Sequence, residues 1–506
     1  MARALKAVPW SLGRSVAAKA NWVFADARMA RSCYTRPEVV RAALDVMLAR
    51  SSEPHVTFIG NAGAGIPTAV MASRARGEAP EFQHCGYYDL ASLYPGRVRI
   101  EPTDEGRLAR FPLSLGPRIS PEARHDYRID PGPQARFWRE IKSSALLAEA
   151  DTLLFFPKLK SNVLSHGLTG ACKLGGIGLL LDEHRMNGHN FHNDRRIADM
   201  LEIARPDLVI TDGIDIAYGG NQMTESGRRL GIVVVADNPV AHDVVACHVL
   251  GLDPRAVAHV RLSAERGWGP LDLADIDLTT EVPLEALRET VRGFGHHGGI
   301  DVTAFPEKYR QETGTPLPVE IVSGPPYEHA GAQGVLLDWL YFSYDIPWRR
   351  TRMAAWPPMA FLVGECGGLP ADAGAQVYVV GARACRHFLQ TVRVERRIDV
   401  PRAIHRILGG ISAWVRFRGG DGRRGWAVLI EGDPPTHRDL ILGIAVGSRG
   451  RTLAPFFRAD LIYDSYVRML GTRVRRWWRN RRPPPVIAAV DILRMRRYRP
   501  DLSGGL

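Results

Sequence analysis

The chain has 506 residues, 45% of them hydrophobic and 24% charged, a composition typical of a folded protein with two to four domains. The formal net charge is +12, but the segment from Arg468 to Arg499 holds eleven arginines against one acid, so the remainder is close to neutral. The absence of a run of about 18 apolar residues excludes a helical membrane span, and the absence of a signal-peptide pattern predicts a cytoplasmic protein.

The first elements predict an N-terminal helical segment over residues 1–50, then an α/β domain over 51–280. A helix starts at Thr35-Arg-Pro, where apolar residues recur with helical spacing. A strand over 55–60 leads into a glycine-rich turn and a helix from Pro67, the usual opening of an α/β unit. A further helix is predicted over 137–150.

Short apolar strands then alternate with helices. The predicted strands cover 152–156, 208–211 and 231–236, and the predicted helices cover 195–204 and 239–250. Continuous apolar strands separated by helices indicate a mostly parallel sheet with helices on both faces.

The second half predicts another such unit. Residues 281–330, rich in glycine and proline, are expected to form a transition between the units. A second α/β unit is predicted over 331–460, with strands over 359–363, 375–380 and 426–430 and helices over 335–342 and near 401–414. The expected fold is therefore α/β, with two units and a basic tail over 461–506.

A cluster of cationic residues follows the strand 152–156. Lys158, Lys160, His166 and Lys173 lie in a glycine-rich stretch. In parallel α/β sheets, ligands bind beyond the carboxyl ends of the strands. Lysine ammonium groups and backbone N–H groups suit a phosphate or a carboxylate. The alternative is a solvated lysine loop at the surface.

The next two strands end in acids. Asp212 follows 208–211, with Asn221 beyond it, and Asp237 follows 231–236, with Asp243 in the next helix. If the sheet is parallel throughout, Asp212 and Asp237 face the same crevice as the lysines. Carboxylates there could bind Mg²⁺ or act as a general base. Asp237 equally suits a helix cap, and Asp243 a place in the first turn.

Histidines and cysteines give no local metal motif. His184, His189 and His192 lack the i, i+4 spacing of a helical zinc site, so hydrogen bonding or substrate contact is favoured. The six cysteines include no CxxC pair, which argues against an iron–sulfur cluster built from local sequence. Cys366 and Cys385 each follow a strand and could meet in the fold. No metal ligand is assigned; the cofactor is left open, with a divalent metal as one option.

Spaced motifs occur in order through the first unit: Lys158-x-Lys160, His166, Thr169-Gly-Ala-x-Lys173, Ile197-Ala-Asp199, Pro206-Asp-Leu-Val-Ile-x-Asp212-Gly-Ile and Asp237-x-Pro-Val-Ala-x-Asp243. This series resembles the domain of unknown function 362 family, best over residues 150–270 and more weakly at Arg36-Pro-Glu-Val-Val. Many members of that family carry a ferredoxin-like iron–sulfur module, which implies redox chemistry. This chain has no CxxCxxCxxxC run, and Glu431-Gly-Asp433-Pro-Pro stands where Gly-Cys-Pro-Pro would be expected.

The basic tail, residues 468–499, combines arginines with Trp477 and Trp478. It suits an anionic membrane surface, or a terminal helix whose tryptophans pack on the body. Nucleic acid is the least favoured partner, because the basic charge is confined to the tail.

These features predict an enzyme acting on a small anionic metabolite, a carboxylate or a phosphate. In the expected site Lys158, Lys160 and Lys173 hold the anion. His166 is the acid/base residue, and Asp212 is a base or a divalent-metal ligand. Asn221, Asp237 and Asp243 are expected to make further contacts with the substrate. In this scheme Lys173 also counts as catalytic. Two alternatives are an iron–sulfur or metal-handling redox or scaffold protein, and a non-catalytic membrane-peripheral partner protein. A homo-oligomer is compatible with the sequence.

Overall fold

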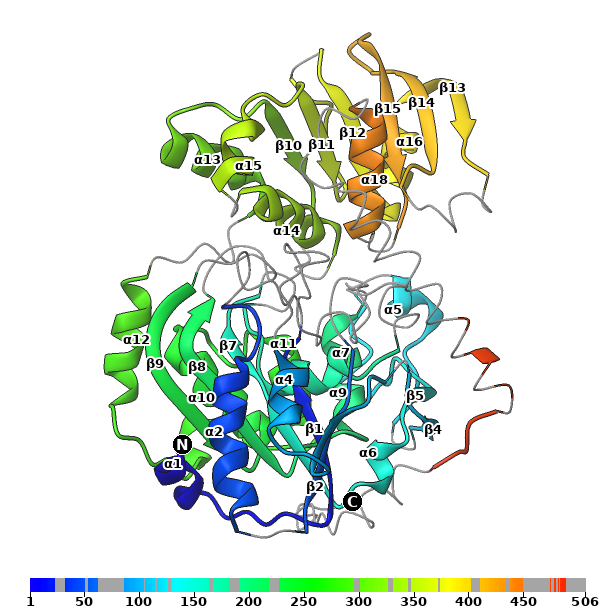
Figure 1. The fold of residues 1–506 in the computed structure, drawn as a ribbon. Helices are drawn as coiled ribbons and strands as arrows, with labels where there is room; N and C mark the ends of the chain where they lie inside the picture. The colour runs from blue at the N-terminus through cyan, green and yellow to red at the C-terminus, as the bar shows by residue number, and fades with distance from the viewer. Residues whose placement is uncertain are drawn as a thin grey trace.

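The computed structural model contains two units, each built on its own β-sheet (Figure 1). It describes residues 1–22, 32–50, 53–61, 86–103, 105–113, 116–125, 129–162, 167–181, 192–217, 227–294, 301–325, 331–344, 347–371, 374–401, 410–432, 435, 437–448, 474, 477–478, 481 and 483–487.

The first unit contains a seven-stranded sheet in the order β3-β2-β1-β6-β8-β7, with β9 also paired to β8. Its strands are β1 (Ser15–Ala20), β2 (His55–Phe58), β3 (Val98–Ile100), β6 (Thr152–Phe156), β7 (Lys158–Lys160), β8 (Leu208–Ala217) and β9 (Gly227–Ala236). Every pairing is parallel except that of β8 with β9. Because β6 and β7 are separated only by Pro157 and both pair with β8, they act as one interrupted strand.

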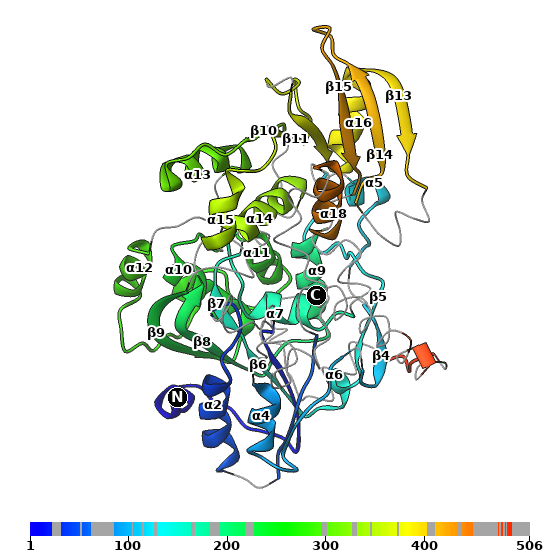
Figure 2. The ribbon, with the colours of Figure 1, turned by 45° about the horizontal axis from the view of Figure 1, so that its top comes forward.

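Helices cover both faces of this sheet, as Figure 1 and Figure 2 show. One face packs against α1 (Ala2–Ala7), α2 (Pro37–Leu48) and α4 (Tyr87–Ser92). The other packs against α6 (Leu146–Glu149), α7 (Ala171–Gly178), α9 (Asn193–Leu201), α10 (Pro239–Leu250), α11 (Ala258–Glu265) and α12 (Leu284–Arg292). Strand side chains alternate between the two cores: Phe155 belongs to the α7 side and Phe156 to the α2 side.

Two sequence predictions for this unit are wrong. Residues 1–50 are not a separate helical segment, because β1 lies in the middle of the sheet, between β2 and β6. The helix predicted over 137–150 is instead β5 (Glu140–Ser144), paired antiparallel with β4 (Leu108–Pro112), followed by the short α6. Burial alternates along β5, a period-2 pattern that fits a strand better than a helix. The helix expected from Pro67 lies outside the described residues.

The second unit contains a six-stranded sheet in the order β10-β11-β12-β15-β14-β13. Its elements are α13 (Phe305–Thr313), β10 (Val319–Ser323), α14 (Ala332–Tyr344), α15 (Pro347–Met353), β11 (Met359–Val363), β12 (Gln376–Val380), α16 (Ala382–Thr391), β13 (Arg393–Asp399), β14 (Ala413–Arg418), β15 (Arg424–Ile430) and α18 (His437–Gly447). The four strands from β10 to β15 are parallel, and β13 and β14 extend the sheet antiparallel. One face packs against α13, α14 and α18, and the other against α16.

The boundaries of this unit also differ from those predicted. Residues 281–330 are not only a transition, since they contain α12, α13 and the edge strand β10. Trp414, expected at the end of a helix, lies in β14, and residues 402–409 lie outside the described part.

Part of the basic tail returns to the first unit. The N–H of Arg110 in β4 donates to Pro485, and the N–H of Ile487 donates to Arg110, both at 2.8 Å. Trp477 and Trp478 are 64% and 62% exposed, so they do not pack on the body of the protein. Within the described residues, no helix combines the length and the apolar character needed to cross a membrane.

Candidate lysine and aspartate site

A buried ion pair lies at the carboxyl end of the interrupted strand. Lys158 of β7 stands opposite Asp212 of β8, and its Nζ lies 2.8 Å from Oδ2 of Asp212. Both side chains are completely buried. Burial lowers the pKa of the Lys158 ammonium, and the charge of Asp212 opposes this effect. The prediction that these two residues share one edge of the sheet is therefore confirmed in their direct contact.

Asp212 has partners besides Lys158. The backbone N–H of Arg36, just before α2, donates to its Oδ2 at 3.0 Å, and the guanidinium Nε of Arg36 lies 3.7 Å from the same oxygen. The N–H of Ile214 donates to Oδ1 at 3.1 Å. Arg36 also contacts Asp215 at 2.9 Å. Two cations and two amides around one carboxylate would repel a divalent cation, so Asp212 does not fit the predicted role of metal ligand.

Three more lysines are buried at the same edge. Lys160 lies at the end of β7 and is 1% exposed, Lys173 lies in the first turn of α7 and is 6% exposed, and Lys19 near the end of β1 is 1% exposed. The whole chain contains only seven lysines, and arginine supplies nearly all the other positive charge. Four of the seven are therefore concentrated, buried, at one edge of one sheet.

Lys19 was missed by sequence reasoning. Its stem passes between Gly60 and Gly178: a Cβ built on Gly60 would lie 2.3 Å from Lys19 Cδ, and one on Gly178 would lie 2.5 Å from Lys19 Cε. Its Nζ donates to the carbonyl of Ala20 and lies 4.6 Å from the centre of the Trp22 ring. The available signal was a single charged residue in the apolar run of β1, which strand recognition would have revealed.

The N-terminus of α7 is occupied by Asp243. The N–H groups of Ala171 and Cys172 donate to its two carboxylate oxygens, at 2.7 and 3.0 Å. His242 Nδ1 lies 2.7 Å from Asp243, and its Nε2 lies 2.6 Å from the hydroxyl of Thr211. Burial acts to raise the pKa of Asp243, but the hydrogen bonds and charge of His242 lower it overall. These amides are thus already bound within the protein, and Asp243 stabilises the helix start rather than facing a ligand.

Asp237 lies at the opposite edge of the sheet. Because β9 runs antiparallel to β8, its last residue Ala236 pairs with Val209, near the start of β8. Asp237 is exposed there, four residues beyond Val233, the residue that pairs with Asp212. The prediction that Asp237 and Asp212 share a crevice is wrong, because strand direction depends on pairing rather than on local composition.

Most of the remaining residues singled out from the sequence lie outside the part of the chain that the structure describes. His166, Asn221, His184 and His189 lie outside the described residues. His192 is buried, and its ring centre lies 5.8 Å from that of Phe137. Within the described part of the chain, no group of three or more His, Cys, Asp or Glu residues is arranged to hold a metal ion.

A second buried charge cluster surrounds Asp199. Its carboxylate accepts hydrogen bonds from the N–H groups of Phe137 and Trp138, at 2.8 and 3.0 Å, and from Arg266 at 2.9 Å. Burial lowers the pKa of Arg266 to about 10. This cluster ties residues 137–138 to α9 and to the end of α11, a structural role for the Ile197-Ala-Asp199 motif.

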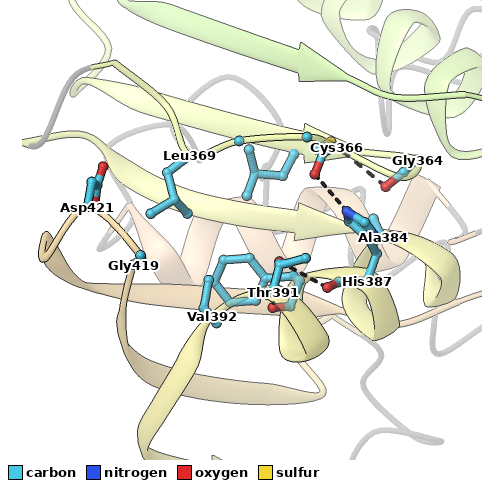
Figure 3. Close-up of a pocket in the computed structure, with 14 residues that line it drawn as sticks. Gly364, Cys366, Leu369, Ala384, His387, Thr391, Val392, Gly419 and Asp421 are labelled. Atoms are coloured by element: carbon cyan, nitrogen blue, oxygen red, sulfur yellow. Dashed lines mark hydrogen bonds between the residues drawn. The ribbon is translucent and has the colours of Figure 1, made fainter.

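A cavity of about 400 Å³ lies in the second unit (Figure 3). Glycines and apolar side chains form most of its wall, together with His387, whose Nε2 lies 2.8 Å from the carbonyl oxygen of Cys366. The Cys366 thiol is buried, and burial raises its pKa, which disfavours the reactive thiolate. Cys385 is buried in the same apolar cluster, and both thiols are free.

The first unit is thus an α/β domain whose distinguishing feature is a lysine-rich edge at the carboxyl ends of parallel strands. Residues 16–248 match the family described as Domain of unknown function (DUF362). The match confirms the resemblance drawn from the motifs, and it extends that resemblance upstream to include β1 with Lys19. The comparison with curated proteins found no match for the chain.

Proposed function

We propose that the carboxyl edge of the first sheet binds a small anion, a carboxylate or a phosphate, and that the protein is an enzyme acting on it. The observation that supports this most is the concentration of four of the seven lysines, all buried, at the edge where α/β proteins bind ligands. Lysine differs from arginine in being a compact ammonium whose pKa shifts readily on burial.

The Lys158–Asp212 pair is the proposed acid/base group. Burial lowers the pKa of the Lys158 ammonium, which makes it a better proton donor, and Asp212 orients it at 2.8 Å. Lys160 and Lys173 supply charge for the anion, and His166 is the proposed second acid/base group. Asp243 and Asp237 have no part in this proposal, given their positions at a helix start and at the far edge.

Ligand-induced stabilisation tests the binding step. A panel of small carboxylates and phosphates is screened for an increase in the melting temperature of the full chain. A ligand at a hundred times its Kd stabilises the folded state by about 2.7 kcal/mol. Lys160→Met and Lys173→Met should abolish the response to any hit, whereas Lys6→Met, on the exposed face of α1, should keep it.

The outcome that would contradict the proposal is a hit retained in both Lys160→Met and Lys173→Met. A compound that stabilises wild type and Lys158→Met equally, yet is converted only by wild type, would separate binding from the acid/base role. If Lys158→Met converts the compound as fast as wild type, the Lys158–Asp212 pair is structural alone.

A membrane-peripheral role of the tail is a second candidate, favoured by the exposure of its two tryptophans. Arg481 lies 3.7 Å from the ring centre of Trp478, so cationic and aromatic groups are presented together. Pelleting with vesicles of phosphatidylserine and phosphatidylcholine should be strong for wild type and weak for Trp477→Ala/Trp478→Ala. Equal pelleting of both would exclude this role.

A further inference from the structure

A group of arginines forms a regular array on the outer strands of the second sheet. Together with one tryptophan on the same strands we call it the arginine grid, which consists of Arg393, Arg396, Arg416, Arg418, Arg424 and Trp426. One row runs across three strands as Arg393, Arg418 and Arg424. The next row runs as Arg396, Arg416 and Trp426. Figure 1 and Figure 2 both show β13, β14 and β15 side by side at the outer end of the sheet.

All six side chains stand on the same face. Phe417 and Ala427 belong to the core beneath α16, so their neighbours Arg416, Arg418 and Trp426 point to the other face. Nearer the middle of the sheet, that face packs against α18 through Val428 and Ile430, in the same cluster as Leu440 and Ile444. The six residues of the grid are exposed, with Trp426 at 40%.

The grid opposes the stability of the sheet. Three cross-strand pairs place arginine directly opposite arginine: Arg393 with Arg418, Arg418 with Arg424, and Arg396 with Arg416. Neighbouring strands lie about 4.8 Å apart, and like charges directly opposite one another are destabilising. An array that costs stability in the free protein is explained by an anionic partner that binds across it.

One acid partly compensates the array. Glu395 occupies a bulge in β13, and its carboxylate lies 3.4 Å from Arg416 and 3.2 Å from Arg424. Arg393, Arg396 and Arg418 make no ion pair with any described residue. Five arginines against one glutamate leave a net charge of +4 on a patch two rows deep.

We infer that the arginine grid binds single-stranded nucleic acid. Proteins that bind single strands without sequence preference combine a cationic track for phosphates with aromatic side chains on which bases stack. The grid supplies both, since Trp426 stands directly opposite Arg416 and two residues from Arg424 on one face. This inference does not depend on the proposed enzyme function, and the grid lies outside residues 16–248, the part of the chain that matches the family.

The same residues favour nucleic acid over a membrane surface. Side chains on one sheet face start from the same plane, and an extended arginine is longer than tryptophan, so the five guanidinium groups can extend beyond the indole of Trp426. Insertion among lipid headgroups requires apolar side chains that reach deepest. A base, in contrast, can lie flat on a half-exposed indole while its phosphates contact the arginines.

Fluorescence anisotropy with a labelled twelve-nucleotide poly(U) strand and the full chain tests the inference. Arg393→Gln/Arg396→Gln/Arg418→Gln should weaken binding at least about tenfold at low salt and reduce the salt slope by about 2, as expected for three lost phosphate contacts. Trp426→Ala should weaken binding about five- to a hundredfold with the slope unchanged. Glu395→Gln should tighten it.

The control variant is Arg288→Gln/Arg292→Gln/Arg310→Gln, three exposed arginines on α12 and α13 that pair with acids of their own helices. It should bind the strand like wild type. Removing the like-charge pairs should leave the melting temperature of the grid variant equal to or above that of wild type. The inference is overturned if the grid variant binds poly(U) as wild type does, if it melts at a lower temperature, or if it loses binding only to anionic vesicles.

Discussion

Replacing each partner of the Lys158–Asp212 pair should have unequal effects. Asp212→Asn leaves the Lys158 ammonium buried near the Arg36 guanidinium, without the Asp212 carboxylate that contacts both groups. Lys158→Met leaves Asp212 with the N–H groups of Arg36 and Ile214 and with the Arg36 guanidinium. The aspartate variant therefore loses the only acid in direct contact with Lys158 among the described residues, while Arg36 keeps its pair with Asp215; the lysine variant loses one of several partners of Asp212.

The expected magnitudes follow from this asymmetry. Removing one partner of a buried pair costs about 3–5 kcal/mol when the other charge is left uncompensated, which is the expected loss for Asp212→Asn. A hydrogen bond to a charged group contributes about 1.5–3 kcal/mol, which is the expected loss for Lys158→Met. Since the folded state lowers the pKa of Lys158, the unfolded chain binds more protons below pH 10.5, and stability should rise as the pH approaches that value.

Urea unfolding followed by circular dichroism, with the slope checked for each variant, measures these losses. Asp272→Asn, which breaks the exposed pair with Arg255, serves as the control and should change stability by about 1 kcal/mol or less. The reasoning is refuted if Lys158→Met destabilises the protein as much as Asp212→Asn, or if neither differs from the control.

Three further predictions concern buried groups of the first unit. Gly60→Ala, at φ +109° and against the stem of Lys19, should cost about 1–3 kcal/mol in thermal unfolding and weaken the response to anions; an unchanged melting temperature would contradict the packing described. Asp243→Asn should cost about 3 kcal/mol at neutral pH. Because the folded state lowers the pKa of Asp243 below the usual 3.8, the stabilisation by its carboxylate is complete above that pH and is lost on acidification. The free energy of unfolding of the variant should therefore fall less than that of wild type as the pH is lowered. Asp199→Asn leaves the Arg266 guanidinium buried and uncompensated, and it should cost about 3–5 kcal/mol by urea unfolding; a loss below 1 kcal/mol would contradict that role.

Much of the architecture was predictable because continuous apolar runs mark buried parallel strands. The runs at β6, β11, β12 and β15 were placed correctly for this reason. β1 was not, because its alanines favour helix locally and its six residues are too few to show a period. The direction of β9 was not predictable either, since antiparallel pairing is decided by contacts with β8.

The site was predictable only in part, for a related reason. Residues that follow one strand directly, such as Lys158 and Asp212, are placed by the rule that carboxyl ends of parallel strands meet at one edge. Asp243 and Asp199 resemble site residues in sequence but bind backbone amides within the protein. A carboxylate that caps a helix and one that meets a ligand use the same residue type, and only the three-dimensional arrangement separates them.

The pairing of residues 485–487 with β4 constrains how the chain can be shortened. A deletion that removes the arginine-rich end would also remove the acceptor for the Arg110 N–H and the donor to its carbonyl. The β4–β5 ribbon would then present an unsatisfied edge, a template for self-association between copies. Shortened versions meant to eliminate the charge should therefore end after Ile487 and replace the preceding arginines by neutral residues instead.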